Sequence, residues 1–188
     1  MENKNKVLLT VIGVATLLVA LVGATFAYFS ATDTSEKVEV TTGAATISLT
    51  AANNSVTNIK PTSFVKASAD TNKDVVKMTL KVTGNSDVAG SYDITMNEPA
   101  ITLGAGEGAV SDIMYAVYKD GSDTAIKTAS FTGTETTTTI VDNTAFSAGS
   151  INDTYYVYVY VNNRDVEQNN LQNVNFKVTF AANASTAA

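Results

Sequence analysis

The side chains that could do chemistry in this chain are carboxylates and hydroxyls, because the sequence contains neither histidine nor cysteine. An imidazole general base, a thiolate nucleophile and the nitrogen and sulfur ligands of zinc are therefore missing. The carboxylates are scattered, and nothing in their spacing marks two of them as a catalytic acid and base. We therefore predict that the protein is not an enzyme, with no catalytic residue, no metal ligand and no cofactor. The scattered carboxylates are Asp93, Glu98, Glu107, Asp112, Asp153, Asp165 and Glu167.

Two short segments share features with ligand-binding loops but lack the rest of each motif. The acidic turn "KDGSD" at residues 119–123 is without the alternating oxygen ligands and distal glutamate of an EF-hand. The glycine-rich "LGAGEG" at residues 103–108 has no helix pattern after it and no lysine at the spacing of a phosphate loop. The first segment is better interpreted as a hairpin turn, since Asp120 and Gly121 tolerate the positive φ angles of a tight turn.

Residues 155–161, "YYVYVYV", place valines on one face of a strand and tyrosines on the other. A strand that is apolar on both faces fits the centre of a sheet that is covered on both sides. Tyr156, Tyr158 and Tyr160 then have two interpretations. They pack in a core with their hydroxyls at its rim, or they form an aromatic platform for a ligand.

The elements that must position these side chains are strands, because apolar residues recur with a period of two almost everywhere after residue 27. Two segments, residues 75–83 and 174–182, show the alternation most clearly. Their apolar side chains, which we expect in the core, are Val76, Met78, Leu80, Val82, Val174, Phe176, Val178 and Phe180.

About nine such segments separated by short turns predict an all-β fold, and their number suggests a jelly-roll-like antiparallel β-sandwich. We expect one such domain over residues 42–188. The predicted strands lie at residues 46–51, 64–67, 75–83, 91–96, 112–118, 125–131, 136–141, 155–161 and 174–182.

The first 27 residues have the layout of a signal peptide. Two lysines precede an apolar run at residues 7–23, and small residues follow it. Small residues three places and one place before the cut allow cleavage after Ala24 or after Ala27. A retained membrane anchor is the alternative, because the run is close to the shortest length that spans a bilayer, about 17 residues.

The formal net charge of the whole chain is −6 at pH 7, and cleavage would remove more positive than negative charge. An acidic chain argues against nucleic acid and anionic membrane surfaces as partners. We therefore expect no nucleic acid partner, and contact with a membrane only through an uncleaved leader.

Four segments of the sequence resemble the TasA and camelysin family of Firmicutes. The most specific is the junction "LVGATFAYFS" after the lysine-flanked leader. The others are "VTTGAATISLTAANNS", the stretch from "NIKPTSFVK" to "SYDITM", and the C-terminal "YYVYVYVNNRDVEQNNLQNVNFKVTFAA". The chain departs from the family at Thr62, where a glycine is usual after the proline.

This resemblance implies cleavage after Ala27 by a SipW-type signal peptidase, so that the mature chain begins at Tyr28. It also implies a secreted subunit of extracellular biofilm-matrix fibres, located in the matrix or at the cell surface. Subunits would join head to tail by donor-strand complementation, with an accessory matrix protein as an additional candidate partner. The donor would be residues 28–41, whose apolar side chains are Tyr28, Phe29, Ala31, Val38 and Val40.

Two other functions stay open at this point. The chain could be a monomeric surface adhesin or binding module that uses the tyrosines of residues 155–161 or the Asn-rich loop at residues 162–173. The resemblance also includes camelysin, described as a surface metalloprotease. A metal site in this chain would have to be built from oxygen ligands, which suit calcium or magnesium better than zinc.

Overall fold

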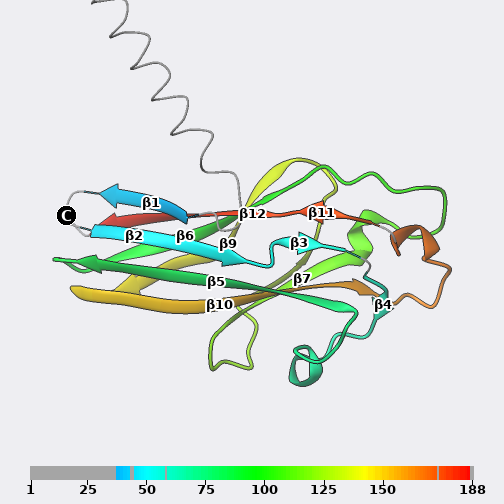
Figure 1. Cartoon of the computed structure of the whole chain (residues 1–188), viewed down its shortest axis with the longest axis horizontal. Helices are drawn as coiled ribbons and strands as arrows, with labels where there is room; N and C mark the ends of the chain where they lie inside the picture. The colour runs from blue at the N-terminus through cyan, green and yellow to red at the C-terminus, as the bar shows by residue number, and fades with distance from the viewer. Residues whose placement is uncertain (1–36, 43–44, 58, 173, 187–188) are drawn as a thin grey trace, which may run out of the picture. The chain divides into compact units, whose positions relative to one another are not determined.

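The computed structural model describes residues 37–42, 45–57, 59–172 and 174–186 (Figure 1). The chain divides into two units, Met1–Thr34 and Ser35–Ala188, and every described residue belongs to the second. The predicted signal peptide, the cut between Ala27 and Tyr28, and the donor residues Phe29 and Ala31 lie outside the described residues. The described part is all-β, and it contains no helix long and apolar enough to span a bilayer.

The main sheet has seven strands, with β10 at its centre. The strand β10 pairs antiparallel with β5 on one side and β7 on the other, and the two-residue strand β4 pairs parallel with its end. In strand order the sheet comprises β1 (Lys37–Thr42), β2 (Ala45–Ala52), β5 (Val75–Ser86), β10 (Gly149–Asn162), β7 (Ile113–Lys119) and β8 (Lys127–Ser130), with β4 at Pro61–Thr62.

A second sheet has three antiparallel strands in the order β12 (Thr179–Thr186), β6 (Gly90–Glu98) and β9 (Thr136–Phe146). A short pair, β11 (Phe176–Lys177) and β3 (Ser55–Val56), forms a third. Three single-turn 3₁₀ segments complete the described structure: η1 (Lys66–Ser68), η2 (Val110–Asp112) and η3 (Asn169–Leu171).

The two larger sheets bury one common hydrophobic core. From the main sheet, Met78, Leu80 and Val82 of β5 are fully buried, and Val76 is partly buried against the same cluster. Ile94 and Met96 of β6 are fully buried from the second sheet. Each large aliphatic side chain contributes about 1.5–3 kcal/mol when it is removed from water, so this shared core is the main stabilising feature.

The prediction of one continuous strand at residues 174–182 is wrong. Val178 interrupts it, because its amide donates to the carbonyl of Asn54 instead of joining either neighbouring ladder. Val174, Val178 and Phe180 are buried, and Phe176 is partly buried with its ring edge-on to Phe131 at 5.1 Å between centroids. Apolar residues still alternate across the interruption, so the same side of the chain faces the core on both sides of Val178. The paired strand changes, because β11 pairs with β3 and β12 pairs with β6.

A strand at residues 64–67 is also wrong, because the chain turns there. The amides of Ser68 and Ala69 donate to the carbonyls of Val65 and Lys66, which closes the 3₁₀ turn η1. The hairpin prediction is confirmed, since β7 and β8 pair antiparallel on either side of Gly121, whose φ is +75°.

Candidate assembly edges and tyrosine face

The first candidate site is the edge of the main sheet, where β1 carries the predicted donor residues Val38 and Val40. Six residue pairs join β1 antiparallel to β2, from Lys37 with Thr50 to Thr42 with Ala45. Within the described residues, β1 has a strand partner on one side only. The C-terminal part of the predicted donor segment, residues 37–41, therefore occupies an edge of its own sheet.

The two sheets approach each other at this edge. The strand β12 ends the order of the second sheet, and it lies against β2 and β1, as Figure 1 also shows. We call this the β1/β12 seam. Its strands come from the two ends of the described domain, so it brings the N-terminal and C-terminal strands together.

The opposite ends of the two sheets form a second seam, between β8 and β9, which we call the β8/β9 seam. Here the Lys127 ammonium donates a 2.6 Å hydrogen bond to the backbone carbonyl of Thr139. A surface hollow of about 320 Å³ lies beside this contact, between β8 and β9. The side chain of Ile126 is 46% exposed there, whereas Ile140 is buried. The residues around the hollow are Ile126, Lys127, Thr139, Ile140 and Asp142.

The second candidate site is the tyrosine face, the side of β10 and β7 that points away from the shared core. Tyr158 and Tyr160 are buried there, while Tyr156 is partly exposed. Phe64 stacks on Tyr160 with 4.5 Å between centroids and an angle of 13°. The Lys66 ammonium lies 5.0 Å from the ring centroid of Tyr158. The segment around η1 therefore covers most of this face, and packing rather than an open platform describes it.

Charged side chains surround the hydroxyl ends of the tyrosine face. The Tyr158 hydroxyl donates to Asp70 at 2.8 Å, and the Lys77 ammonium lies 2.9 Å from the same carboxylate oxygen. These contacts lower the pKa of Asp70, with the Lys77 hydrogen bond as the largest cause. Burial, followed by the hydrogen bond to Asp70, raises the pKa of Tyr158. Lys77 also lies over the ring of Tyr156, 3.9 Å from its centroid.

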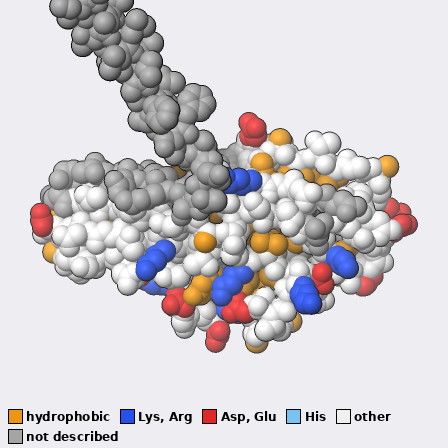
Figure 2. Space-filling model, viewed as in Figure 1, with side chains coloured by type: hydrophobic (Ala, Val, Ile, Leu, Met, Phe, Trp, Pro, Cys, Tyr) orange, Lys and Arg blue, Asp and Glu red, His pale blue; other side chains and the backbone are white. Residues whose placement is uncertain are grey.

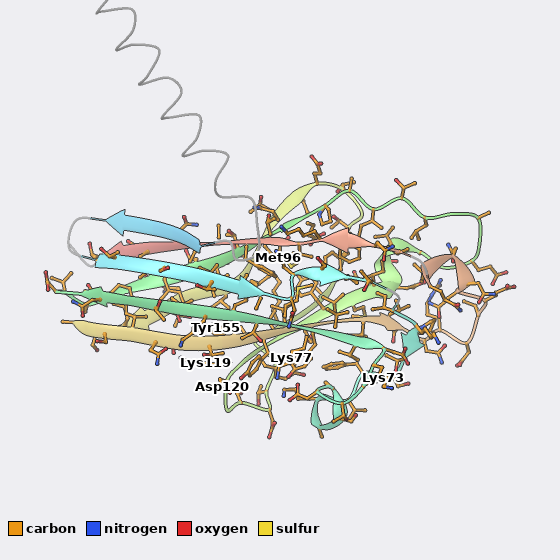
Figure 3. The ribbon with its side chains drawn as sticks, viewed as in Figure 1. Lys73, Lys77, Met96, Lys119, Asp120 and Tyr155 are labelled. Atoms are coloured by element: carbon orange, nitrogen blue, oxygen red, sulfur yellow. The ribbon has the colours of Figure 1, made fainter. Side chains whose placement is uncertain are left out.

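Figure 3 places these groups relative to the main sheet: Met96 lies on one side of β5 and β10, and Lys77 and Asp120 lie on the other. On the face shown in Figure 2, basic and acidic side chains lie close together with apolar atoms between them. The mixture agrees with the ion pairs Lys77 to Asp70 and Lys119 to Asp153. On this face, acidic side chains therefore partly neutralise basic ones.

A polar network also links the two large sheets. The Tyr92 hydroxyl of β6 lies 2.6 Å from the Tyr155 hydroxyl of β10 and donates to Asp153 at 2.7 Å. The Lys119 ammonium lies 2.6 Å from the other oxygen of Asp153. Burial alone would raise the pKa of Asp153, but hydrogen bonds from Lys119 and Tyr92 outweigh it and lower the pKa. The network satisfies polar groups at the end of the core, which would otherwise be costly to bury.

The described part of the Asn-rich loop, residues 162–172, is held by a buried carboxylate, that of Asp112. Arg164 lies 2.6 Å from one oxygen of Asp112, and the Gln168 amide donates to the other at 3.0 Å. Gln168 is itself 3% exposed and also donates to the carbonyl of Asn162. These contacts give the loop a structural role, because its buried polar groups face partners in the same chain.

In the part of the chain that the structure describes, no three acidic side chains gather closely enough to hold a metal ion. Comparisons with family models, with curated proteins and with solved structures give no match for this chain.

The sequence reasoning missed the β8/β9 seam and the buried acid Asp112. A signal for the second was present, since Asp112 stands directly before an apolar strand, where an acid can cap a turn by accepting from the backbone. In the structure Asp112 does so, accepting from the amide of Ala109 at 2.9 Å. The seam has no local signal, because Lys127 and Thr139 belong to strands of different sheets.

Proposed function

We propose that this chain is a secreted structural subunit that polymerises head to tail into extracellular fibres, in the manner of the TasA and camelysin family. On this proposal the two large sheets form a jelly-roll-like sandwich. A SipW-type signal peptidase removes residues 1–27, and the mature chain begins at Tyr28. The N-terminal strand of one subunit then adds to a sheet of the next.

The observation that carries the proposal is the position of β1. A strand held at an edge by one partner, close to the start of the mature chain, can leave β2 and pair in the same way with another copy. Main-chain hydrogen bonds supply the affinity of such an added strand, and alternate side chains supply specificity. Val38 and Val40 have the required spacing of two.

The direction of assembly follows from the same geometry. An edge that donates a strand and a different edge that accepts one make a heterologous contact, which continues as an open filament unless rotation closes a ring. Exposed strand edges are usually protected in monomeric proteins because they pair readily with other chains. In a fibre subunit, the pairing of an exposed strand edge with another chain is what joins one subunit to the next.

The test begins with the secreted protein. N-terminal sequencing should give Tyr28 as the first residue, and negative-stain electron microscopy of the same sample should show fibres. A variant without residues 28–41 should fold, as judged by circular dichroism, and remain monomeric in light scattering. A chain that begins at Lys37 is the matched control for folding, because it keeps β1 and its pairing with β2. Fibres of normal length from the variant without residues 28–41 would contradict the proposal.

A further inference from the structure

The sheet edges of this protein differ in how much room they leave for another strand. Four strands end the sheet orders of the described residues: β1 and β8 in the main sheet, and β12 and β9 in the second. At the β1/β12 seam, β12 lies against β1 and β2. At the β8/β9 seam, β8 has 4 residues and β9 has 11. Most of β9 therefore extends beyond the reach of β8.

We propose that the outer edge of β9 is the acceptor for the N-terminal segment of a second copy, an inference that rests on the proposed polymerisation. No described strand pairs with this edge. The carbonyl of Thr139, on β9, accepts a side-chain hydrogen bond from Lys127 of β8. A single lysine is a replaceable cover, since an incoming strand offers backbone amides to the same carbonyl.

Length supports this occupant. At about 3.3 Å per residue, the 11 residues of β9 extend for about 36 Å, and residues 28–41 suffice to pair along all of it. The exposed side chain of Ile126, beside the hollow at the seam, provides an apolar contact for an aromatic side chain of the segment, which contains Tyr28 and Phe29.

Charge supports the same occupant. Residues 28–41 contain Asp33, Glu36 and Glu39 against one lysine. When Lys127 leaves the Thr139 carbonyl, its ammonium can pair with one of these carboxylates. Asp142, at the same hollow, repels them, so the acidic part of the segment is favoured at the Lys127 end.

The occupant comes from another copy. Before assembly, β1 pairs with β2 at the β1/β12 seam, and β9 is at the opposite end of the sheet orders. In the fibre, residues 37–41 leave β2 and pair with β9 of the next copy. Donor and acceptor are therefore different surfaces, which is the heterologous arrangement that a linear fibre needs.

Because the chain contains no cysteine, cross-linking can test the assignment directly. Fibres are grown from a mixture of two single-cysteine variants and then oxidised. One variant carries Ala31→Cys in the donor, and the other carries Thr139→Cys or Ala145→Cys on β9. The matched control acceptors are Thr128→Cys on β8 and Asn183→Cys on β12, which are exposed like Thr139 and Ala145. Paired strands bring opposite Cβ atoms to about 5 Å, within disulfide reach.

We expect disulfide-linked dimers of donor and β9 variants on non-reducing gels, in at least about tenfold excess over either control pair. Charge reversal by Lys127→Glu should slow fibre growth about tenfold, whereas Lys81→Glu, on an exposed site of β5, should not.

Fibres whose cross-links concentrate at Asn183→Cys or Thr128→Cys would overturn the β9 assignment and leave polymerisation intact. Dimers of Thr139→Cys with itself would overturn it in favour of pairing between two β9 edges. If the unmodified protein forms no fibres, polymerisation and the acceptor assignment both fail.

Discussion

Both faces of the sheet formed by β5, β10 and β7 carry buried side chains, but different structures cover them. On the inner face, side chains such as Leu80 and Val157 pack against the second sheet and are 0% exposed. On the outer face, Tyr158 is equally inaccessible, yet it lies under the turn-containing segment that contributes Phe64 and Lys66.

The difference lies in what each cover requires of the side chains beneath it. A second sheet excludes water mainly with hydrocarbon, so the inner face is mainly aliphatic. A short irregular segment leaves charged groups close by, and the outer face therefore uses tyrosines, whose rings are buried while their hydroxyls reach carboxylates such as Asp70. We therefore expect the inner face to determine global stability and the outer face to tolerate more change.

The largest expected effect is on the inner face. Leu80→Ala removes a fully buried side chain and leaves a cavity between the sheets, which should lower the free energy of unfolding by about 2–5 kcal/mol. Urea denaturation followed by circular dichroism measures the change. Lys81→Ala, on the exposed opposite side of the same strand, should change it by less than about 0.5 kcal/mol. Equal losses for both variants would contradict the assignment of the core.

A smaller loss is expected when the cover of the outer face is removed. Phe64 is partly buried and stacks on Tyr160, so Phe64→Ala should cost roughly 1.5–2.5 kcal/mol, less than for a fully buried phenylalanine. The chain has no tryptophan, and near-ultraviolet circular dichroism of its tyrosines should report the loss of packing. Val65→Ala, at a side chain that is 55% exposed, is the matched control. A loss as large as that of Leu80→Ala would show that the two faces contribute equally.

The residues of β10 explain which part of this fold could be predicted from the sequence. The alternation of valine and tyrosine at residues 155–161 predicts a central strand covered on both sides, and β10 does lie between β5 and β7. The spacing of apolar residues along a strand is a local property, so the order of residues shows directly which side chains share a face. The same reasoning placed Met78, Leu80 and Val82 on one face.

What covers the outer face could not be predicted in this way. Residues 64–67 have the composition of a strand, but Phe64 stacks on Tyr160 and the following backbone closes into η1. This choice depends on rings far away in the sequence. The β8/β9 seam could not be predicted from the sequence for the same reason, because it forms only when β8 and β9 have joined different sheets.

The third prediction concerns a single hydroxyl on the outer face. Tyr158→Phe keeps the ring under Phe64 and Lys66 but removes the 2.8 Å hydrogen bond to Asp70, which should cost about 1 kcal/mol. Thermal unfolding in parallel with Tyr156→Phe provides the comparison, because the Tyr156 hydroxyl makes a longer bond of 3.2 Å at an exposed site. If Tyr156→Phe costs more, the buried hydroxyl is not the stronger contact.

The smallest effect, and the one that tests the link between the sheets, is the acid dependence of stability at Asp153. Its pKa is below the ordinary value of 3.8, since hydrogen bonds from Lys119 and Tyr92 outweigh burial. A lowered folded pKa means that the ionised group stabilises the fold above pH 3.8, and that this contribution is lost as the pH falls through the folded pKa. Asp153→Asn should therefore differ from the unmodified protein at pH 7 by less than about 1 kcal/mol, because Lys119 is partly exposed. The difference in the free energy of unfolding should shrink at pH 3. The control is Asp87→Asn, in an exposed loop. A difference that is the same at both pH values would show that the ionisation of Asp153 does not stabilise the contact between β6, β7 and β10.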